Sequence, residues 1–221
     1  MNKEWSELNK EMQSKLKKEE TYKSGIDTLF ELRNTLMDEI AVYKEICSRA
    51  DFDAMPFINA SGYHSKTIAY SLWHIFRIED IVAHTLIAND EQVFFSGGFD
   101  KSIGSPIITT GNELKREQIA EFSEKLDIDE LYRYIVEVKT GTEKLLSALP
   151  YSELKRKMTE EDKERVMSLN VVSTDENAIW LIDYWCGKDV RGLIQMPFSR
   201  HWIMHVEAAN KIKEKLVKST C

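Results

Sequence analysis

The chain has 221 residues, a length that fits one domain or at most two small ones. Hydrophobic residues make up 43% and charged residues 30%, as in ordinary globular proteins, so neither disulfides nor a metal ion are needed merely to fold. The formal net charge is −7, and this excess of acidic side chains disfavours a nucleic-acid backbone as partner.

Cysteine usage and hydropathy indicate the cellular compartment. Cys47, Cys186 and Cys221 are far apart and form neither a CxxC motif nor a disulfide framework. The first twenty residues are charged throughout and lack the apolar core of a signal peptide. No apolar run approaches the roughly 18 residues of a membrane span. We therefore expect a cytoplasmic protein with reduced thiols and no membrane partner.

Apolar residues at helical spacing predict the first elements. Residues 1–20 should form an accessory helix, packed on the main body or on a partner subunit, through the stripe Trp5, Leu8, Met12 and Leu16. Residues 21–49 should form a long helix with one face in the core. An irregular stretch broken by Pro56 and Gly62 leads to a third helix, which begins at Ser65 or Thr67. This helix is apolar around most of its circumference and is expected to be central.

The second half of the chain continues in the same way. The segment 89–113 is rich in Gly, Ser, Thr and Asn and is expected to be a loop over one end of the fold. A short helix is predicted for 115–125 and a long one for 129–149, which Pro150 ends. Further helices are predicted for the charged segment 152–167, for the apolar segment that Gly187 ends, and for the last segment, which has Pro197 in its first turn.

These elements predict a single all-α domain. Four long helices within residues 21–218 should form a four-helix bundle, and residues 1–20 should be an N-terminal helical extension. The long connection over 90–126 implies a crossover between helices rather than a simple up-and-down topology.

Three histidines stand out as candidate metal ligands. His201 and His205 are four residues apart, which places both imidazoles on one helix face, one turn apart. They lie in the apolar stripe of the last helix, and His74 shares a side of the central helix with Ile78 and Ile81. Buried imidazoles without partners are costly. The pattern therefore predicts either one shared divalent ion or a cluster satisfied by hydrogen bonds.

Other chemistries find little support. His64 and His84 are each ten positions from His74, which turns them about 80° away on a regular helix. In HWIMH, a tryptophan stands where the HExxH zinc proteases need glutamate, and no histidine follows a glutamate by three residues as in di-iron bundles. Phosphate-binding glycine loops and the GxSxG nucleophile turn are absent.

Two motifs resemble the DinB-like superfamily: Trp73-His74 followed by IFRIED, and the HxxxH of His201 and His205 at the start of the last helix. The intervening NELKREQIAEFSEKLDIDELYRYI is similar to that family's approach to its third helix, so the resemblance covers about residues 22–217. It implies a four-helix bundle, commonly dimeric, with a zinc, nickel or similar ion held by His74, His201 and His205. Relatives include transferases and isomerases that use bacillithiol, mycothiol or glutathione.

The leading hypothesis for function combines this resemblance with coordination chemistry. Three neutral histidines leave open positions on an ion, as in catalytic zinc sites, and the ion could activate a substrate thiol or water. We expect a thiolate to attack a small electrophile, with Tyr70 and Arg200 as candidate substrate contacts. No general base is evident, since Arg77, Glu79 and Asp80 are expected in salt bridges or on the helix surface.

Three alternatives stay open. The ion could serve a hydrolase, or it could be structural in a non-catalytic dimer, which a fourth protein ligand or a sealed site would favour. The third is a metal-free bundle with a hydrogen-bonded histidine cluster. The expected partners are a small-molecule substrate, a low-molecular-weight thiol and a second copy of the chain, with no nucleic acid and no membrane.

Overall fold

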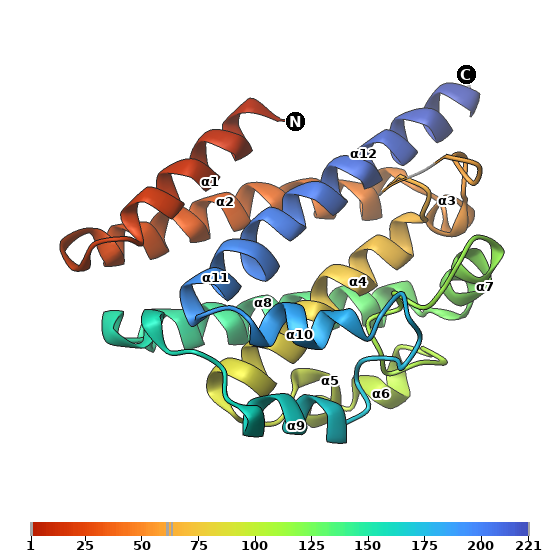
Figure 1. Cartoon of the computed structure of the whole chain (residues 1–221). Helices are drawn as coiled ribbons and strands as arrows, with labels where there is room; N and C mark the ends of the chain where they lie inside the picture. Colours follow the sequence, from red (N-terminus) through yellow and green to blue (C-terminus); the bar gives the residue numbers. More distant parts are fainter. Residues whose placement is uncertain (1, 61, 63, 221) are drawn as a thin grey trace.

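The computed structural model describes residues 2–60, 62 and 64–220, and this part of the chain contains helices and no β-strand (Figure 1). The helices, in chain order, are α1 (Lys3–Lys15), α2 (Glu19–Ile46), α3 (Arg49–Asp53), α4 (Ile68–Asp80), α5 (Val93–Ser96), α6 (Phe99–Ser102), α7 (Glu117–Lys125), α8 (Ile128–Ala148), α9 (Glu160–Ser168), α10 (Trp180–Cys186), α11 (Val190–Gln195) and α12 (His201–Thr220). Two π-helical segments, Ile81–Ala88 and Met196–Arg200, continue α4 and precede α12. None of the described helices is long and apolar enough to cross a membrane.

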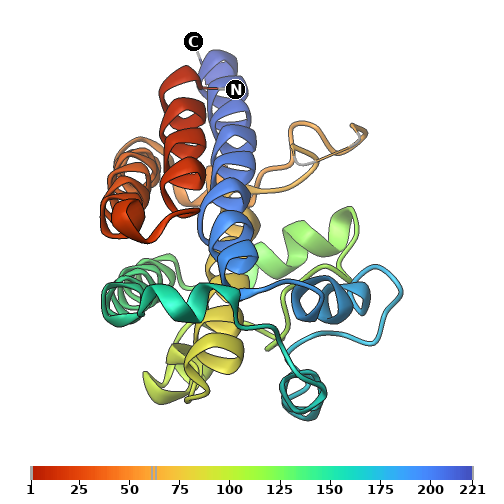
Figure 2. The same ribbon diagram turned by 60° about the vertical axis from the view of Figure 1, so that its left-hand side comes forward.

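Helix α4 is the centre of the fold, as its sequence predicts. Every residue of α4 is buried, and the helix contacts both α8 and α12. Helix α2 also contacts α8 and α12, so these four helices surround a common interior (Figure 2). The all-helical fold class is therefore confirmed.

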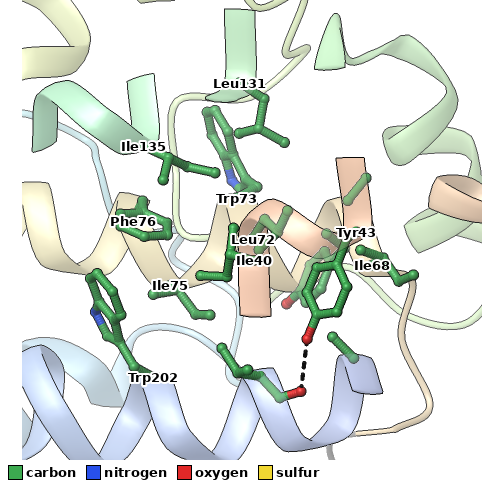
Figure 3. Close-up of a cluster of buried hydrophobic side chains, with 14 of the residues drawn as sticks. Ile40, Tyr43, Ile68, Leu72, Trp73, Ile75, Phe76, Leu131, Ile135 and Trp202 are labelled. Atoms are coloured by element: carbon green, nitrogen blue, oxygen red, sulfur yellow. Dashed lines mark hydrogen bonds between the residues drawn. The ribbon is translucent and has the colours of Figure 1, made fainter. Parts of the chain in front are cut away.

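Side chains from all four of these helices meet in one large apolar cluster (Figure 3). Trp73 and Phe76 of α4 belong to it together with Leu131 of α8 and Trp202 of α12. On the side of α2, the hydroxyl of Tyr43 donates a hydrogen bond to the carbonyl of Val206 in α12 at 3.1 Å. Burial of this many large side chains fixes how the helices lie relative to one another.

Helix α4 begins where the sequence predicts. Thr67 has extended backbone, and its side chain accepts a hydrogen bond from the amide of Tyr70 at 2.9 Å. This contact satisfies one of the amides that a helix start leaves without a helical partner. The cap sets the register of α4 and thereby the position of His74 two turns further along.

The predicted N-terminal helix is present as α1 and packs along α2 of its own chain. Trp5, Met12 and Leu16 of its apolar stripe are buried. At its start, the amide of Asn2 donates to the carboxylate of Glu207 in α12. Helix α1 thus packs on the main body of its own chain, which is one of the two predicted arrangements, and it also reaches α12.

The structure differs from the prediction in two connecting segments. The expected loop 89–113 contains the short helices α5 and α6, separated by Gly98 with a φ of +72°. The segment 152–167 is not one helix, because a 3₁₀ turn is followed by an extended stretch that bridges Lys157 to Asp189. Helix α9 then starts anew with a capping box between Thr159 and Asp162.

Candidate metal centre

The three predicted ligands come together in the interior. His74 extends from α4, and His201 and His205 extend from the first two turns of α12. The ring centroids lie 4.6–5.0 Å apart in all three pairs, and one ligand nitrogen of each ring lies within 4.8 Å of the others. All three side chains are buried. This cluster, hereafter the histidine triad, is compact enough to hold a single ion.

The histidines are neutral at ordinary pH, the form that binds metal. Burial lowers the pKa of His74 from 6.5 to about 4, although its hydrogen bond to Thr110 acts in the opposite direction. Burial and the proximity of the other rings lower the pKa of both His201 and His205 well below 6.5. Within the described chain, Nδ1 of His201 is buried without a hydrogen-bond partner, which leaves one nitrogen lone pair or proton unsatisfied.

A backbone segment, residues 108–111, orients His74. Nδ1 of His74 lies 2.8 Å from the carbonyl oxygen of Thr110. A carbonyl can only accept, so Nδ1 carries the proton and Nε2 keeps its lone pair for a ligand. Histidines that bind metal commonly have such a partner on the other ring nitrogen.

Two neighbours of His74 on α4 hold the same backbone segment. The hydroxyl of Tyr70 donates to the carbonyl of Gly111 at 2.9 Å, and Nε of Arg77 donates to the carbonyl of Ile108 at 2.9 Å. Gly111 has a φ of +78°, and a Cβ there would lie 2.9 Å from the Tyr70 ring. Only glycine therefore permits both the backbone conformation and the close approach to α4.

A buried ion pair fixes α4 relative to α12 near the histidine triad. Glu79 of α4 accepts two hydrogen bonds from Arg33 of α2, at 2.7 and 2.9 Å, and one from Nε1 of Trp202 at 2.7 Å. The Arg33 guanidinium also stacks on the Trp202 ring, 4.3 Å from its centroid. Trp202 lies between His201 and His205 in the sequence, so this contact constrains the helix that carries both.

The histidine triad borders a cavity of about 270 Å³. Beyond the histidines and Asn112, the lining is mostly apolar and comprises Ile78, Trp180, Leu181, Tyr184, Trp185, Met196 and Pro197. Trp180 and Tyr184 are 48% and 36% exposed, so the cavity opens to solvent beside α10. In the described part of the chain, no further His, Cys, Asp or Glu joins the triad as a fourth candidate ligand.

The remaining predicted residues occupy distinct places. Tyr70 is buried, stacks on His74 with centroids 5.5 Å apart and lines a second pocket, whereas Arg200 is exposed and lines neither pocket at the triad. Their roles in substrate binding stay predictions. His64 packs on Phe57, and His84 pairs with Asp90 at 2.7 Å, so neither joins the triad.

The acidic and basic residues after His74 are not on the helix surface, which corrects one part of the prediction. Arg77, Glu79 and Asp80 are all fully buried. They form salt bridges, as the other part of the prediction stated: Arg77 with Asp80 and Glu79 with Arg33. Their contacts serve the backbone and neighbouring helices, and none of them lines the cavity.

Two residues near the triad were not among the predicted site residues. Lys66 and Asn112 both line the second pocket together with His74 and His205. Lys66 precedes the N-cap Thr67 of α4, so helical periodicity does not extend to it and could not have indicated its position. Asn112 follows Gly111 in a turn, and nothing in the sequence places that turn against α4.

Comparison with known proteins adds no family assignment. No protein-family model matches the sequence, and no curated protein matches it. The class that the fold and the site define is therefore an all-helical protein with a buried three-histidine cluster that could hold a metal ion.

Proposed function

We propose that this chain is a DinB-like four-helix bundle that binds one divalent ion, zinc or nickel, through His74, His201 and His205. The mutual contacts of α2, α4, α8 and α12, and the position of the histidines on the second and fourth of these helices, support the proposal. So does the neutral state of the three imidazoles, because metal ligation requires deprotonated nitrogens.

We further propose that the protein transfers a low-molecular-weight thiol to a small electrophile. The single observation that carries this proposal is the solvent-open cavity bordered by three histidines with no fourth protein ligand among the described residues. Structural zinc sites have four protein ligands, whereas catalytic sites keep a position open. When bound, the ion would supply Lewis acidity that lowers the pKa of a thiol or of water.

The residues of the chain would contribute binding and orientation. Thr110 holds His74 in one tautomer, and the apolar cavity wall formed by α10 offers a surface on which an apolar electrophile can bind. In the reaction, the thiol releases its proton to solvent and its sulfur forms a bond to carbon. The leaving group departs with the electron pair of the broken bond. A hydrolase would use the same site with water as the nucleophile.

The proposal that the chain binds a metal ion is tested by elemental mass spectrometry on tag-free protein purified without chelator. We expect about one equivalent of metal per chain in the parent and near none in a His201→Ala/His205→Ala variant. A matched His64→Ala variant should keep its metal, because His64 lies outside the triad. Parent protein that takes up no zinc, nickel or manganese on reconstitution would contradict the metal site.

The proposal of thiol transfer is tested by measuring how fast each thiol displaces chloride from monochlorobimane. Metal-loaded protein is assayed with glutathione, bacillithiol, mycothiol and cysteine in turn, beside the variant that lacks two ligands. Conjugation above the uncatalysed rate in the parent alone would support a thiol transferase. Metal-loaded protein that accelerates none of these reactions would overturn it, and ester or amide hydrolysis by the same sample would favour the hydrolase.

A further inference from the structure

Two pockets meet at the histidine triad, and their walls differ in character. The cavity of about 270 Å³ already described, hereafter the aromatic cavity, is walled by α10 and by Met196 and Pro197. The second, of about 210 Å³, is lined by Gly62, Lys66, Tyr70, Asn112, His74 and His205 and is hereafter the lysine pocket. His74, His205 and Asn112 line both pockets. A ligand over the triad can therefore extend into both.

Lys66 places a positive charge beside the triad. Its Nζ lies 4.8 Å from the centroid of the Tyr70 ring, and that ring in turn stacks on His74 with an interplanar angle of 10°. The lysine is also close enough for its charge to lower the pKa of both His74 and His205. Lys66, Tyr70 and His74 thus form a continuous stack that ends at a candidate metal ligand.

The charge of Lys66 has no acidic partner in the described chain, where no carboxylate lies within 4.0 Å of Nζ. Lys139, by contrast, whose side chain is also largely removed from solvent, pairs with Glu143 at 2.8 Å. Partial burial lowers the pKa of Lys66, because desolvation disfavours the ammonium ion. Burial, and after it the charge of Glu113, raises the pKa of Tyr70. Glu113 itself accepts a hydrogen bond from Thr109 and does not line the pocket. A bound anion would supply the missing counter-charge.

Asn112 adds neutral donors to the same pocket. Its Oδ1 accepts a hydrogen bond from the Thr110 hydroxyl at 2.8 Å, which fixes the amide group. No acceptor for its Nδ2 is found among the described residues, so both amide hydrogens are available to a ligand. An ammonium and an amide at one polar pocket match a carboxylate, which accepts several hydrogen bonds at once.

We propose that the lysine pocket binds a carboxylate group of the substrate, with Lys66 and Asn112 as its partners, while an apolar or aromatic part of the same substrate fills the aromatic cavity. The substrate class is then a small amphipathic carboxylic acid whose reacting atom lies over the triad. The identification of this molecule as a substrate rests on the proposed function, whereas its binding does not. Lys66 and Asn112 are accordingly binding residues.

The test compares phenylacetate with its neutral isostere phenylacetamide by ligand-observed NMR titration of the full chain in chelator. Phenylacetate should bind about tenfold more tightly, the ratio expected for one charge-assisted hydrogen bond. This preference should disappear in Lys66→Met, through weaker binding of phenylacetate only, and persist in Lys66→Arg. A matched Lys144→Met variant on the exposed face of α8 should behave as the parent.

Several outcomes would overturn the proposal: equal affinity of the two probes in the parent, equal weakening of both in Lys66→Met, or no binding of either. Retention of phenylacetamide binding by Lys66→Met shows that the variant is folded. Because the titration is done without metal, it stays informative if the chain fails to bind metal or to conjugate thiols. In a second titration with zinc-loaded protein, the preference for phenylacetate over phenylacetamide should again depend on Lys66. A preference that persists in zinc-loaded Lys66→Met would also count against the proposal.

Discussion

His74 differs from His201 and His205 because one hydrogen bond, from its Nδ1 to the carbonyl of Thr110, fixes both its tautomer and its orientation. The carbonyl of Thr110 holds the proton on Nδ1, and burial lowers the pKa to about 4. The unfolded chain binds a proton at this residue near pH 6.5 and the folded protein near pH 4. The stabilising effect of neutral His74 is therefore complete above the unfolded pKa and is lost as the pH falls towards 4.

The metal-free protein should accordingly become less stable in mild acid. Between about pH 7 and about pH 5, His74 alone should lower the free energy of unfolding by about 2 kcal/mol, and His201 and His205 act in the same direction. Urea unfolding in chelator at both pH values measures this. A His74→Asn variant, which cannot titrate, should show a smaller pH dependence, and an identical dependence would contradict the assignment.

At the scale of a residue, the sequence predicted the three clustered histidines but not their surroundings. The HxxxH spacing and the apolar helix around His74 were sufficient to place three histidines in the interior. Lys66 and Asn112 were missed because their proximity to the triad depends on segments without periodicity. The positive φ of Gly111 and its close approach to Tyr70 become visible only in three dimensions.

At the scale of an element, Glu79 links three helices. It connects α4 to Arg33 of α2 and to Trp202 of α12 through hydrogen bonds of 2.7–2.9 Å. The sequence could not predict this link, because Glu79 and Arg33 are 46 residues apart and lie within helices whose charged residues are normally solvated. The two ions are buried, so their energetics differ from those of surface pairs.

Replacing Glu79 by leucine should leave the Arg33 charge buried without its principal partner. We expect a loss of about 3–5 kcal/mol in the free energy of unfolding, measured with urea. The pair Lys44–Asp129 is equally short at 2.7 Å but exposed, so Asp129→Ala should cost less than about 1 kcal/mol. The double variant Arg33→Met/Glu79→Leu should recover much of the loss, and a double variant as unstable as Glu79→Leu would show that packing dominates.

The boundaries of several elements depend on local chemistry that periodicity does not report. The N-cap Thr67 was predictable because threonine before an apolar run is a frequent helix start. The division of 151–168 into a 3₁₀ turn and α9 depends on the contact of Lys157 with Asp189, which are far apart in sequence. Similarly, α5 and α6 are too short for a helical period to be detected.

At the scale of the whole molecule, a metal ion would join α4 to α12. Ligands on two helices bind the ion together only in the folded state, so the ion should raise stability by mass action. With free zinc at about a hundred times the dissociation constant, the gain is about 2.7 kcal/mol, or about 5–10 °C in Tm for a chain of this size. Differential scanning calorimetry should show this rise in the parent and not in His201→Ala/His205→Ala. An equal rise in both proteins would place zinc elsewhere.

The position of the triad in the chain also affects when the site can form during synthesis. His201 and His205 follow His74 by more than half the chain length, so the ribosome completes α4 long before α12. While α12 is still being made, His74 can already contact Thr110 but lacks the other two imidazoles. Metal capture by the whole triad should therefore wait until α12 has been made, when α2, α4 and α8 have already left the ribosome.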